Sequence, residues 1–320
     1  MHSDKRDGWR RRRREMEGDD RRYTPAGPRR EPAWGRVVDG PLGWVAERLL
    51  PGGKANALDI RLNAVDIHLP GLPSGLDGFS ILHLSDLHPA NLPPTMDRAV
   101  ELLRGVTADL AVLTGDFQTH GRPGAGATAR ALAPVLASLE TRHGTVAVLG
   151  NHDRHDMADA LAGLGVRVLV NEHLVVDHGG ARLVLTGTDD ANRFYTEAAA
   201  AALRSAPHGF RVALVHSPDL AAAAEASGHA LYLTGHTHGG QVCLPGGVPV
   251  VTASDAPRRL ASGRWRLGAM EGYTSRGVGV GRPPLRYNCR GEIARIVLSA
   301  CEAPTDGPAD GRPRHRRPRS

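Results

Sequence analysis

The chain has 320 residues and a formal net charge of +6, and 41% of its residues are hydrophobic, so it is long enough to bury a large core. Its cysteines, Cys243, Cys289 and Cys301, are widely spaced and form no Cys-x-x-Cys pair, which argues against a disulfide scaffold and against a thiolate zinc site. No stretch reaches the roughly 18 apolar residues of a membrane-spanning helix, and acidic residues follow the early arginine run where an export signal would be apolar.

In chain order, the first segment is a basic tail. Residues 1–36 carry 12 Lys or Arg and 7 Asp or Glu, a balance of +5, and their charge, Gly and Pro predict disorder. A short apolar segment follows at 42–50, which is too short to span a membrane and could at most lie on its surface; we expect it to pack against the domain. Apolar and polar residues then alternate from Leu58 to Leu69, which is the period of a half-buried strand.

Strands and helices alternate through the middle of the chain. Short apolar runs predict strands at 79–84, 110–113, 145–149, 166–170, 212–215 and 230–233. Helical periodicity predicts helices at 95–104, 128–139, 157–164, 195–204 and 219–226. Pro134 falls inside the second helix, where it predicts a kink. A hairpin is predicted from Leu174 to Leu185, turning at Gly179-Gly180.

The last third of the chain changes to strands, of which 265–273 and 293–298 are the clearest. This order predicts an α/β fold, a layered sandwich of two mixed β-sheets flanked by helices, in one domain at 37–302. The end, 303–320, is an Arg/Pro-rich tail with a balance of +3 that we expect to be disordered, which leaves −2 for the domain.

The basic tails raise the question of partners. The domain between them is nearly neutral, so we expect no nucleic-acid partner. Peripheral contact of the tails with anionic membrane lipid stays open. We expect a cytoplasmic location, and the sequence predicts no oligomeric state.

Five polar clusters follow short apolar strands. They are Ser85-Asp86-Leu87-His88, Thr114-Gly115-Asp116, Gly150-Asn151-His152-Asp153, Val215-His216-Ser217 and Gly235-His236-Thr237-His238. Because the loops beyond strand carboxyl ends converge at one rim of an α/β sheet, we expect these clusters to meet. Their oxygen and nitrogen donors suit Mn, Fe or Zn. The sequence therefore predicts a dinuclear metal site at the strand ends, with Asp116 able to bridge both ions.

The charge of such a site favours an anionic substrate. Two divalent ions bring about +4, while Asp86, Asp116 and a bridging hydroxide bring about −3, so the centre stays positive. A metal pair about 4 Å apart can activate water and stabilise the in-line transition state of phosphoester hydrolysis.

The ordered set Asp-x-His, Gly-Asp, Gly-Asn-His-Asp, His and Gly-His-Thr-His resembles the calcineurin-like metallophosphoesterase superfamily, over roughly 58–298. The segments Leu233–Gln241 and Ser275–Gly279 look like its bacterial phosphodiesterase branch. The resemblance implies one ion bound by Asp86, His88, Asp116 and His238, and a second bound by Asp116, Asn151, His216 and His236. It also implies that His152 contacts the phosphate and assists the leaving group, and it leaves Asp153 as a candidate for orienting the loop.

The sequence departs from the superfamily at Thr119, where many members carry an acid that orients the catalytic histidine. Asp189 and Asp190 are candidates for supporting the site, with a plain strand-end turn as the alternative. Gln241 and Arg276 either line the substrate pocket or only cap a turn and pair with a carboxylate. Exposed positions without a role are expected for five further histidines, His120, His143, His155, His208 and His229.

We therefore expect a metal-dependent phosphoester hydrolase, a phosphodiesterase with a dinuclear centre and a bridging hydroxide. The alternatives are a phosphomonoesterase and a non-catalytic metal-binding scaffold with basic tails. The natural substrate is not predicted by any motif.

Overall fold

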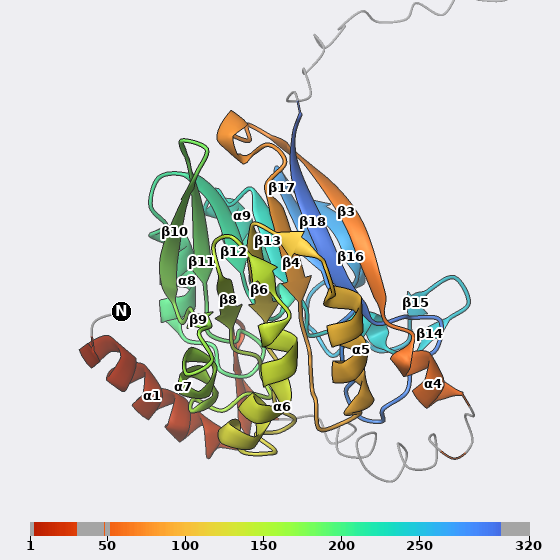
Figure 1. The fold of residues 1–320 in the computed structure, drawn as a ribbon. Coiled ribbons are helices and arrows are strands. Elements are labelled where there is room, and N and C mark those ends of the chain that lie inside the picture. The colour runs from red at the N-terminus through yellow and green to blue at the C-terminus, as the bar shows by residue number, and fades with distance from the viewer. Residues whose placement is uncertain (1–2, 31–47, 49–51, 302–320) are drawn as a thin grey trace, which may run out of the picture.

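The computed structural model describes residues 3–30, 48 and 52–301. Its centre is two six-stranded sheets, with helices on their outer faces (Figure 1). The first sheet has the order β3 (Arg61–Pro70), β18 (Glu292–Cys301), β4 (Ser80–Leu84), β6 (Leu110–Thr114), β8 (Thr145–Val148) and β9 (Arg167–Val168). Strands β4, β6, β8 and β9 run parallel, whereas β18 is antiparallel to β4 and parallel to β3.

The second sheet has the order β10 (Glu172–His178), β11 (Ala181–Gly187), β12 (Phe210–Leu214), β13 (Leu231–Thr234), β17 (Met270–Thr274) and β16 (Gly263–Leu267). Its four inner strands are parallel and its two edge strands antiparallel. The predicted sandwich of two mixed sheets is thus confirmed. The predicted hairpin is β10–β11, in which Gly179 and Gly180 turn with φ of 58° and 77°.

Three layers of apolar side chains hold the sandwich together. The layer between the sheets joins residues such as Ile81 and Val112 to Leu185 and Val212, all of them 0% exposed. An outer layer packs α5 (Pro94–Leu103), α6 (Ala125–Ala137) and α7 (Met157–Ala162) on the first sheet. The other packs α8 (Glu197–Arg204) and α9 (Ala221–Ala226) on the second. Removing this apolar surface from water is the main stabilising contribution to such a fold.

Short elements complete the described chain. They are α4 (Gly53–Leu58), β5 (Thr107–Ala108), β7 (Glu140–Thr141), β14 (Cys243–Leu244), β15 (Val248–Pro249) and the 3₁₀ turns η2 (Ser74–Leu76), η3 (Pro218–Leu220), η4 (His238–Gly240) and η5 (Arg258–Leu260). In the part of the chain that is described, no helix has the length and apolar character needed to cross a membrane.

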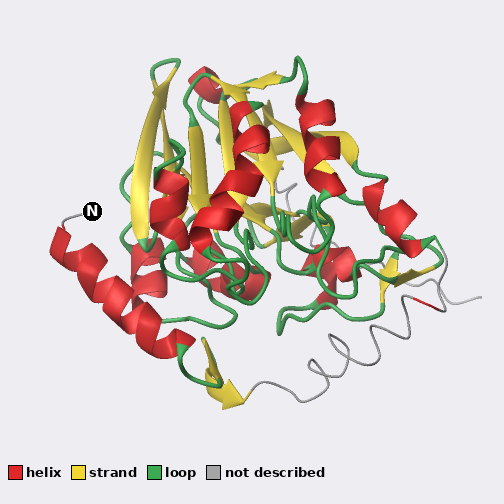
Figure 2. Cartoon of the chain, turned by 60° about the horizontal axis from the view of Figure 1, so that its bottom comes forward, coloured by secondary structure: helices red, strands yellow, loops and turns green. Residues whose placement is uncertain are grey.

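The N-terminal segment is folded where it is described, so the expected disorder is wrong for residues 3–30. Helix α1 (Ser3–Glu17) lies along one lower edge of the molecule, and β1 (Arg21–Thr24) and β2 (Gly27–Arg30) form a hairpin after it (Figure 2). Trp9, Arg13 and Met16, spaced to share one helix face, are the inward residues of α1. Amphipathic spacing thus outweighs the charge of the segment.

One further prediction differs from the structure, and others concern residues that the structure does not describe. The single strand expected at 265–273 is wrong, because the chain reverses at Gly268 (φ 56°) and forms the antiparallel pair β16–β17. The rest of the expected N-terminal tail (31–36), the apolar segment at 42–50 apart from Arg48, and the expected C-terminal tail at 303–320 lie outside the described residues.

Candidate metal centre

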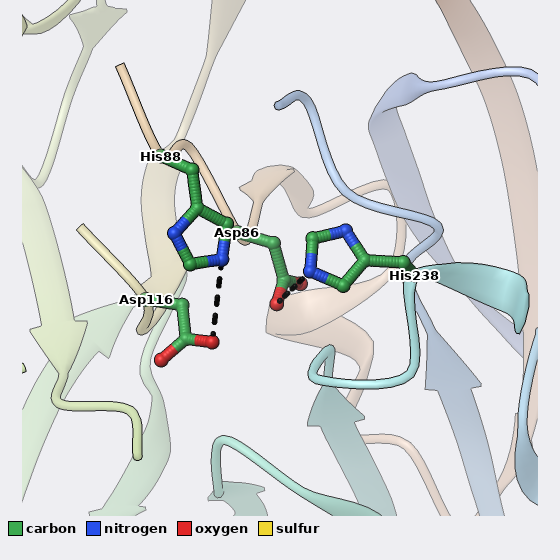
Figure 3. Close-up of side chains that lie close together, drawn as sticks. All are labelled: Asp86, His88, Asp116 and His238. Atoms are coloured by element: carbon green, nitrogen blue, oxygen red, sulfur yellow. Dashed lines mark ion pairs between the residues drawn. The ribbon is translucent and has the colours of Figure 1, made fainter. Parts of the chain in front are cut away.

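The five predicted clusters meet at one end of the sandwich, beyond the carboxyl ends of β4, β6, β8, β12 and β13. One ligand atom from each of Asp86, His88, Asp116 and His238 lies within 4.8 Å of the others. Figure 3 shows these four side chains pointing toward one another. A second group with the same spacing consists of Asp116, His216 and His236, so Asp116 belongs to both.

The distances around Asp116 define the centre of the site. Its Oδ2 lies 3.4 Å from Nε2 of His88 and 3.3 Å from Nε2 of His216. Oδ1 of Asn151 lies 3.0 Å from the same His216 nitrogen and 2.8 Å from Nδ1 of His236. On the other side, Nε2 of His238 lies 3.5 Å from Oδ1 of Asp86. The structure therefore brings together all seven residues that the sequence singled out as metal ligands.

Backbone carbonyls set the protonation of three of the histidines. Nδ1 of His88 donates to the Gln118 oxygen and Nδ1 of His216 to the Thr114 oxygen, both at 2.6 Å. Nε2 of His236 donates to the Ala253 oxygen at 2.9 Å. Because a carbonyl only accepts, each of these nitrogens carries a ring proton, and the other ring nitrogen, turned toward the centre, offers a lone pair when the ring is neutral. A ring held in this way is typical of a metal-ligating histidine.

The donor set fits divalent cations. Nε2 of His88 is buried without a hydrogen-bond partner. The lone-pair nitrogens of His216 and His236 lie 3.3 Å apart, and both face Oδ1 of Asn151. When the rings are neutral, these buried acceptors face one another without a donor and repel, and a cation between them turns that repulsion into attraction. Carboxylate, imidazole and amide donors without thiolate suit Mn, Fe or Zn.

The backbone at the site is strained. Five of the predicted ligands have a positive φ, a region that non-glycine residues enter at a cost of about 1–3 kcal/mol each: Asp86 (52°), His88 (37°), Asp116 (59°), His236 (71°) and His238 (50°). Glycines let the loops come close, because a Cβ at Gly150 would collide with the Asp116 carboxylate and one at Gly235 with the Asp86 carboxylate. The surrounding fold therefore holds the side chains in positions that the local chain disfavours.

Asp153 orients the loops. Its carboxylate accepts backbone N–H groups from Asp116 at 2.9 Å and from Phe117, Gln118 and Gly150 at 2.8 Å. Burial, followed by the charge of Asp116, raises the pKa of Asp153 to about 7. For Asp116 itself, burial acts to raise the pKa, but the imidazole groups that face the carboxylate, His216 first, outweigh burial and hold that pKa well below its usual value. Asp116 is thus an ionised carboxylate at the centre of the site.

His152 is oriented by the main chain rather than by an acid. The N–H of His120 donates to Nδ1 of His152 at 3.2 Å. The proton of the neutral ring therefore sits on Nε2, which lies 3.9 Å from Oδ2 of Asp116. Burial holds the pKa of His152 well below its usual value, so the ring is neutral. The hydroxyl of Thr119, at the position of the missing acid, instead contacts Nδ1 of His88 at 3.1 Å.

A cavity of about 700 Å³ opens over this cluster. His88, Asp116, Asn151, His152, His236 and His238 line its floor. Its walls include four arginines that sequence reasoning missed, Arg22, Arg193, Arg258 and Arg282. They come from separate segments without a common motif, so no local signal could have identified them. Their positive charge suits an anionic ligand.

The remaining candidates have structural partners. Gln241 bonds the Pro283 oxygen at 2.6 Å and the Gly281 N–H at 2.8 Å, and Arg276 pairs with Glu292 at 3.1 Å, so the turn-capping and pairing alternatives hold. Asp190 accepts the Arg193 N–H at 2.6 Å. His120 is exposed as expected but lines the cavity, whereas His155 is buried against α1, contrary to expectation.

Comparison with known proteins agrees with this geometry. The family model of the calcineurin-like phosphoesterases matches residues 79–240. The chain is similar to phosphodiesterase YaeI of Escherichia coli (strain K12), with 32% identity over 69% of this chain and 82% of the relative. It is also similar to two uncharacterized metallophosphoesterases. YkuE of Bacillus subtilis (strain 168) is 29% identical over 72% of this chain and 82% of its own. A protein of Aquifex aeolicus (strain VF5) is 30% identical over 75% and 92%.

Proposed function

The chain belongs to the calcineurin-like phosphoesterase family and is a phosphoester hydrolase, and from that premise we propose that it is a phosphodiesterase with a dinuclear metal centre. The observation that carries the proposal is the position of Asp116, whose carboxylate is shared by two groups of ligand atoms. A carboxylate that serves two sites is what a pair of adjacent ions requires.

In this proposal Asp86, His88, Asp116 and His238 hold one ion, and Asp116, Asn151, His216 and His236 hold the other. The ions are Mn, Fe or Zn. When bound, they would supply Lewis acidity and would activate water, as the bridging hydroxide of this proposal, for attack on phosphorus.

The residues of the chain position the phosphate and the leaving group. His152 carries its proton on Nε2, which faces the cavity, and from there it donates to a phosphate oxygen and assists the departing oxygen. The arginines on the cavity walls attract the anionic substrate. Asp153 keeps the loops of Asp116 and Asn151 at a fixed separation through its backbone hydrogen bonds.

Two observations favour a diester over a monoester. The volume of about 700 Å³ leaves room for groups on both sides of the phosphate, and one similar protein is named a phosphodiesterase. The test is to load the purified protein with Mn and to compare kcat/KM on chromogenic aryl phosphodiesters and monoesters. We expect the diester to be preferred at least about tenfold, a difference of about 1.4 kcal/mol in transition-state binding.

The other outcomes identify the alternatives. A preference for the monoester would make the protein a phosphomonoesterase. No turnover on either ester, with two ions bound per chain, would favour the metal-binding scaffold.

We also propose a cytoplasmic location and peripheral contact with anionic lipid, of which the lipid contact rests on the basic residues at 10–14 and 312–319. Cell fractionation tests both. Recovery in the membrane fraction that high salt releases would support lipid contact, and recovery outside the cytoplasm would contradict the location.

A further inference from the structure

Arg13 is the buried member of an arginine run on α1. The run extends from Arg10 to Arg14, and Arg11, Arg12 and Arg14 are exposed. The side chain of Arg13, in contrast, is 0% exposed. Helix α1 also lies outside the segment that the family model matches. A buried guanidinium is unfavourable unless its N–H groups are bonded and its charge is paired, so the partners of Arg13 indicate what its burial achieves.

The partners of Arg13 come from two loops of the metal centre. Its Nη2 donates to the backbone oxygens of Gly150 at 3.1 Å and of Asp153 at 2.8 Å. Its Nη1 forms an ion pair with Asp189, in the loop after β11. The guanidinium carbon lies 3.6 Å above the ring of Phe194. The planar fork of one arginine thus joins the loop after β8 to the loop after β11.

The two carbonyls that Arg13 binds flank Asn151 and His152 in the sequence. From the other direction, the Asp153 carboxylate binds the N–H groups of Gly150 and Asp116. The turn is therefore held by its carbonyls on one side and by its N–H groups on the other. Helix α1 adds a second contact, because Glu17 accepts the N–H of His155 at 2.6 Å and lies 2.9 Å from Nδ1 of its ring.

Asp189 is held in place for its pairing with Arg13. Nε1 of Trp9, one turn earlier on α1, donates to the second Asp189 oxygen at 2.7 Å. The Asp189 N–H bonds Asn171 at 2.9 Å. The carboxylate that neutralises Arg13 is thus held by Trp9 of α1 and by Asn171 of the loop after β9. The guanidinium is therefore a rigid support rather than a mobile surface charge.

We propose that Arg13 is a positioning residue. By binding the Gly150–Asp153 turn, it holds the Asn151 side chain where it can bind the second ion and the His152 ring where it can contact the phosphate. This proposal rests on the proposed function for the roles of those two side chains. It assigns to α1 a part in the reaction, as the element that completes the support of the turn. Outer partners of ligand-bearing groups commonly change metal affinity or activity by about 10–100-fold when removed.

The test compares Arg13→Ala, Arg13→Lys and the matched control Arg12→Ala in the full chain. Arg12 neighbours Arg13 on α1 but is exposed. Three quantities are measured: kcat and KM on the diester, the affinity for Mn of the weaker site, and hydrogen–deuterium exchange of peptides over 150–155. The exchange and Mn measurements do not depend on turnover.

For Arg13→Ala we expect kcat to fall about 10–100-fold, Mn affinity at the weaker site to fall about tenfold, and exchange to accelerate over 150–155. KM should change less than about threefold, since the cavity walls stay intact. Arg13→Lys keeps the charge but lacks the planar fork, so it should lose most of the same activity while remaining folded. Arg12→Ala should match the wild type in all three measurements.

Unchanged exchange over 150–155 and unchanged Mn affinity in a folded Arg13 variant would overturn the proposal. So would acceleration of exchange spread evenly over the sheets, since that would make Arg13 a general stabiliser. If the wild type hydrolyses no diester, the proposed function fails, and the exchange and Mn measurements still decide whether Arg13 holds the turn.

Discussion

Oδ2 of Asp153 accepts the backbone N–H of Asp116 at 2.9 Å, and this hydrogen bond joins loops that follow two different strands. The same oxygen accepts the N–H of Gly150 at 2.8 Å. One buried carboxylate therefore sets the separation between the shared carboxylate of the centre and the turn that carries Asn151. The spacing of the candidate ligand groups therefore depends on this residue, although it is not among the predicted ligands.

Replacing Asp153 by Asn should therefore destabilise the fold. An amide has one acceptor oxygen, and its NH₂ group would face backbone N–H groups, so at least two of the four bonds should be lost. Hydrogen bonds to charged groups contribute about 1.5–3 kcal/mol each, so we expect the free energy of unfolding to fall by about 3–6 kcal/mol. Urea denaturation measures it, with the exposed Asp97→Asn as control. A loss within about 0.5 kcal/mol of the control would contradict this role.

Asp116→Asn should remove metal and activity together. The amide keeps the size of the side chain but loses the negative charge that two ions would share, so both sites weaken. We expect bound Mn to fall from about two ions per chain to less than one and kcat to fall at least about 10³-fold. Elemental analysis after gel filtration measures the metal. The exposed Asp177→Asn is the matched control. Full metal content in the Asp116 variant would show that this carboxylate is not a shared ligand.

His152→Ala should separate chemistry from metal binding. Its Nε2 proton faces the cavity, and the ring is not among the predicted ligands. We expect kcat to fall about 10²–10³-fold, as for the loss of a hydrogen-bond donor placed at the charge that develops in the transition state, with Mn content unchanged. The comparison variant is His208→Ala, at an exposed position. An empty metal site in the His152 variant would mean that the roles assigned to these histidines are wrong.

Arg282→Ala should weaken substrate binding more than turnover. Arg282 lines the cavity wall, away from the ligand atoms that surround Asp116. We expect KM for an anionic diester to rise about threefold to tenfold at low salt, and the effect to shrink above about 0.5 M salt because exposed charges are screened. Steady-state kinetics at two ionic strengths measure it. A loss confined to kcat, the same at both salt concentrations, would place Arg282 in the chemical step instead.

The pH dependence of stability should depend on His229, which is buried, contrary to the exposed position expected from the sequence, and whose ring contacts the Ala224 oxygen and the Thr186 hydroxyl. Burial lowers its pKa to about 4, against about 6.5 in an unfolded chain. The unfolded state therefore binds the proton first as the pH falls. The stability that the neutral ring contributes is fully present above about pH 6.5 and is lost toward about pH 4, by up to about 3 kcal/mol.

The measurement for His229 is the free energy of unfolding of wild type and His229→Gln between pH 6.5 and pH 5. Over this range the wild type should lose more stability than the variant, by about 1–2 kcal/mol. Carboxylates and other histidines titrate in both proteins and cancel in the comparison. Parallel curves for the two proteins would show that His229 does not titrate as its burial requires.

Local patterns were sufficient for most of the fold. The period of two in β3 indicates a strand with one buried face, and the apolar runs of β4, β6 and β12 indicate strands that are buried on both faces. The pattern failed where one turn residue mattered, because Gly268 divides an otherwise continuous strand signal. It failed again in α1, where a high density of arginine concealed an amphipathic face.

The sequence by itself determined which side chains are available to bind metal, because metal chemistry demands particular donors and the strand ends place them on one rim. Only the tertiary structure decided what holds them there. Arg13 reaches Gly150 and Asp153 across 137 and 140 residues of chain. His152 takes its orientation from the His120 N–H, 32 residues away. Such contacts carry no local signature, because an arginine or a backbone N–H acquires its partner only when the surrounding elements pack.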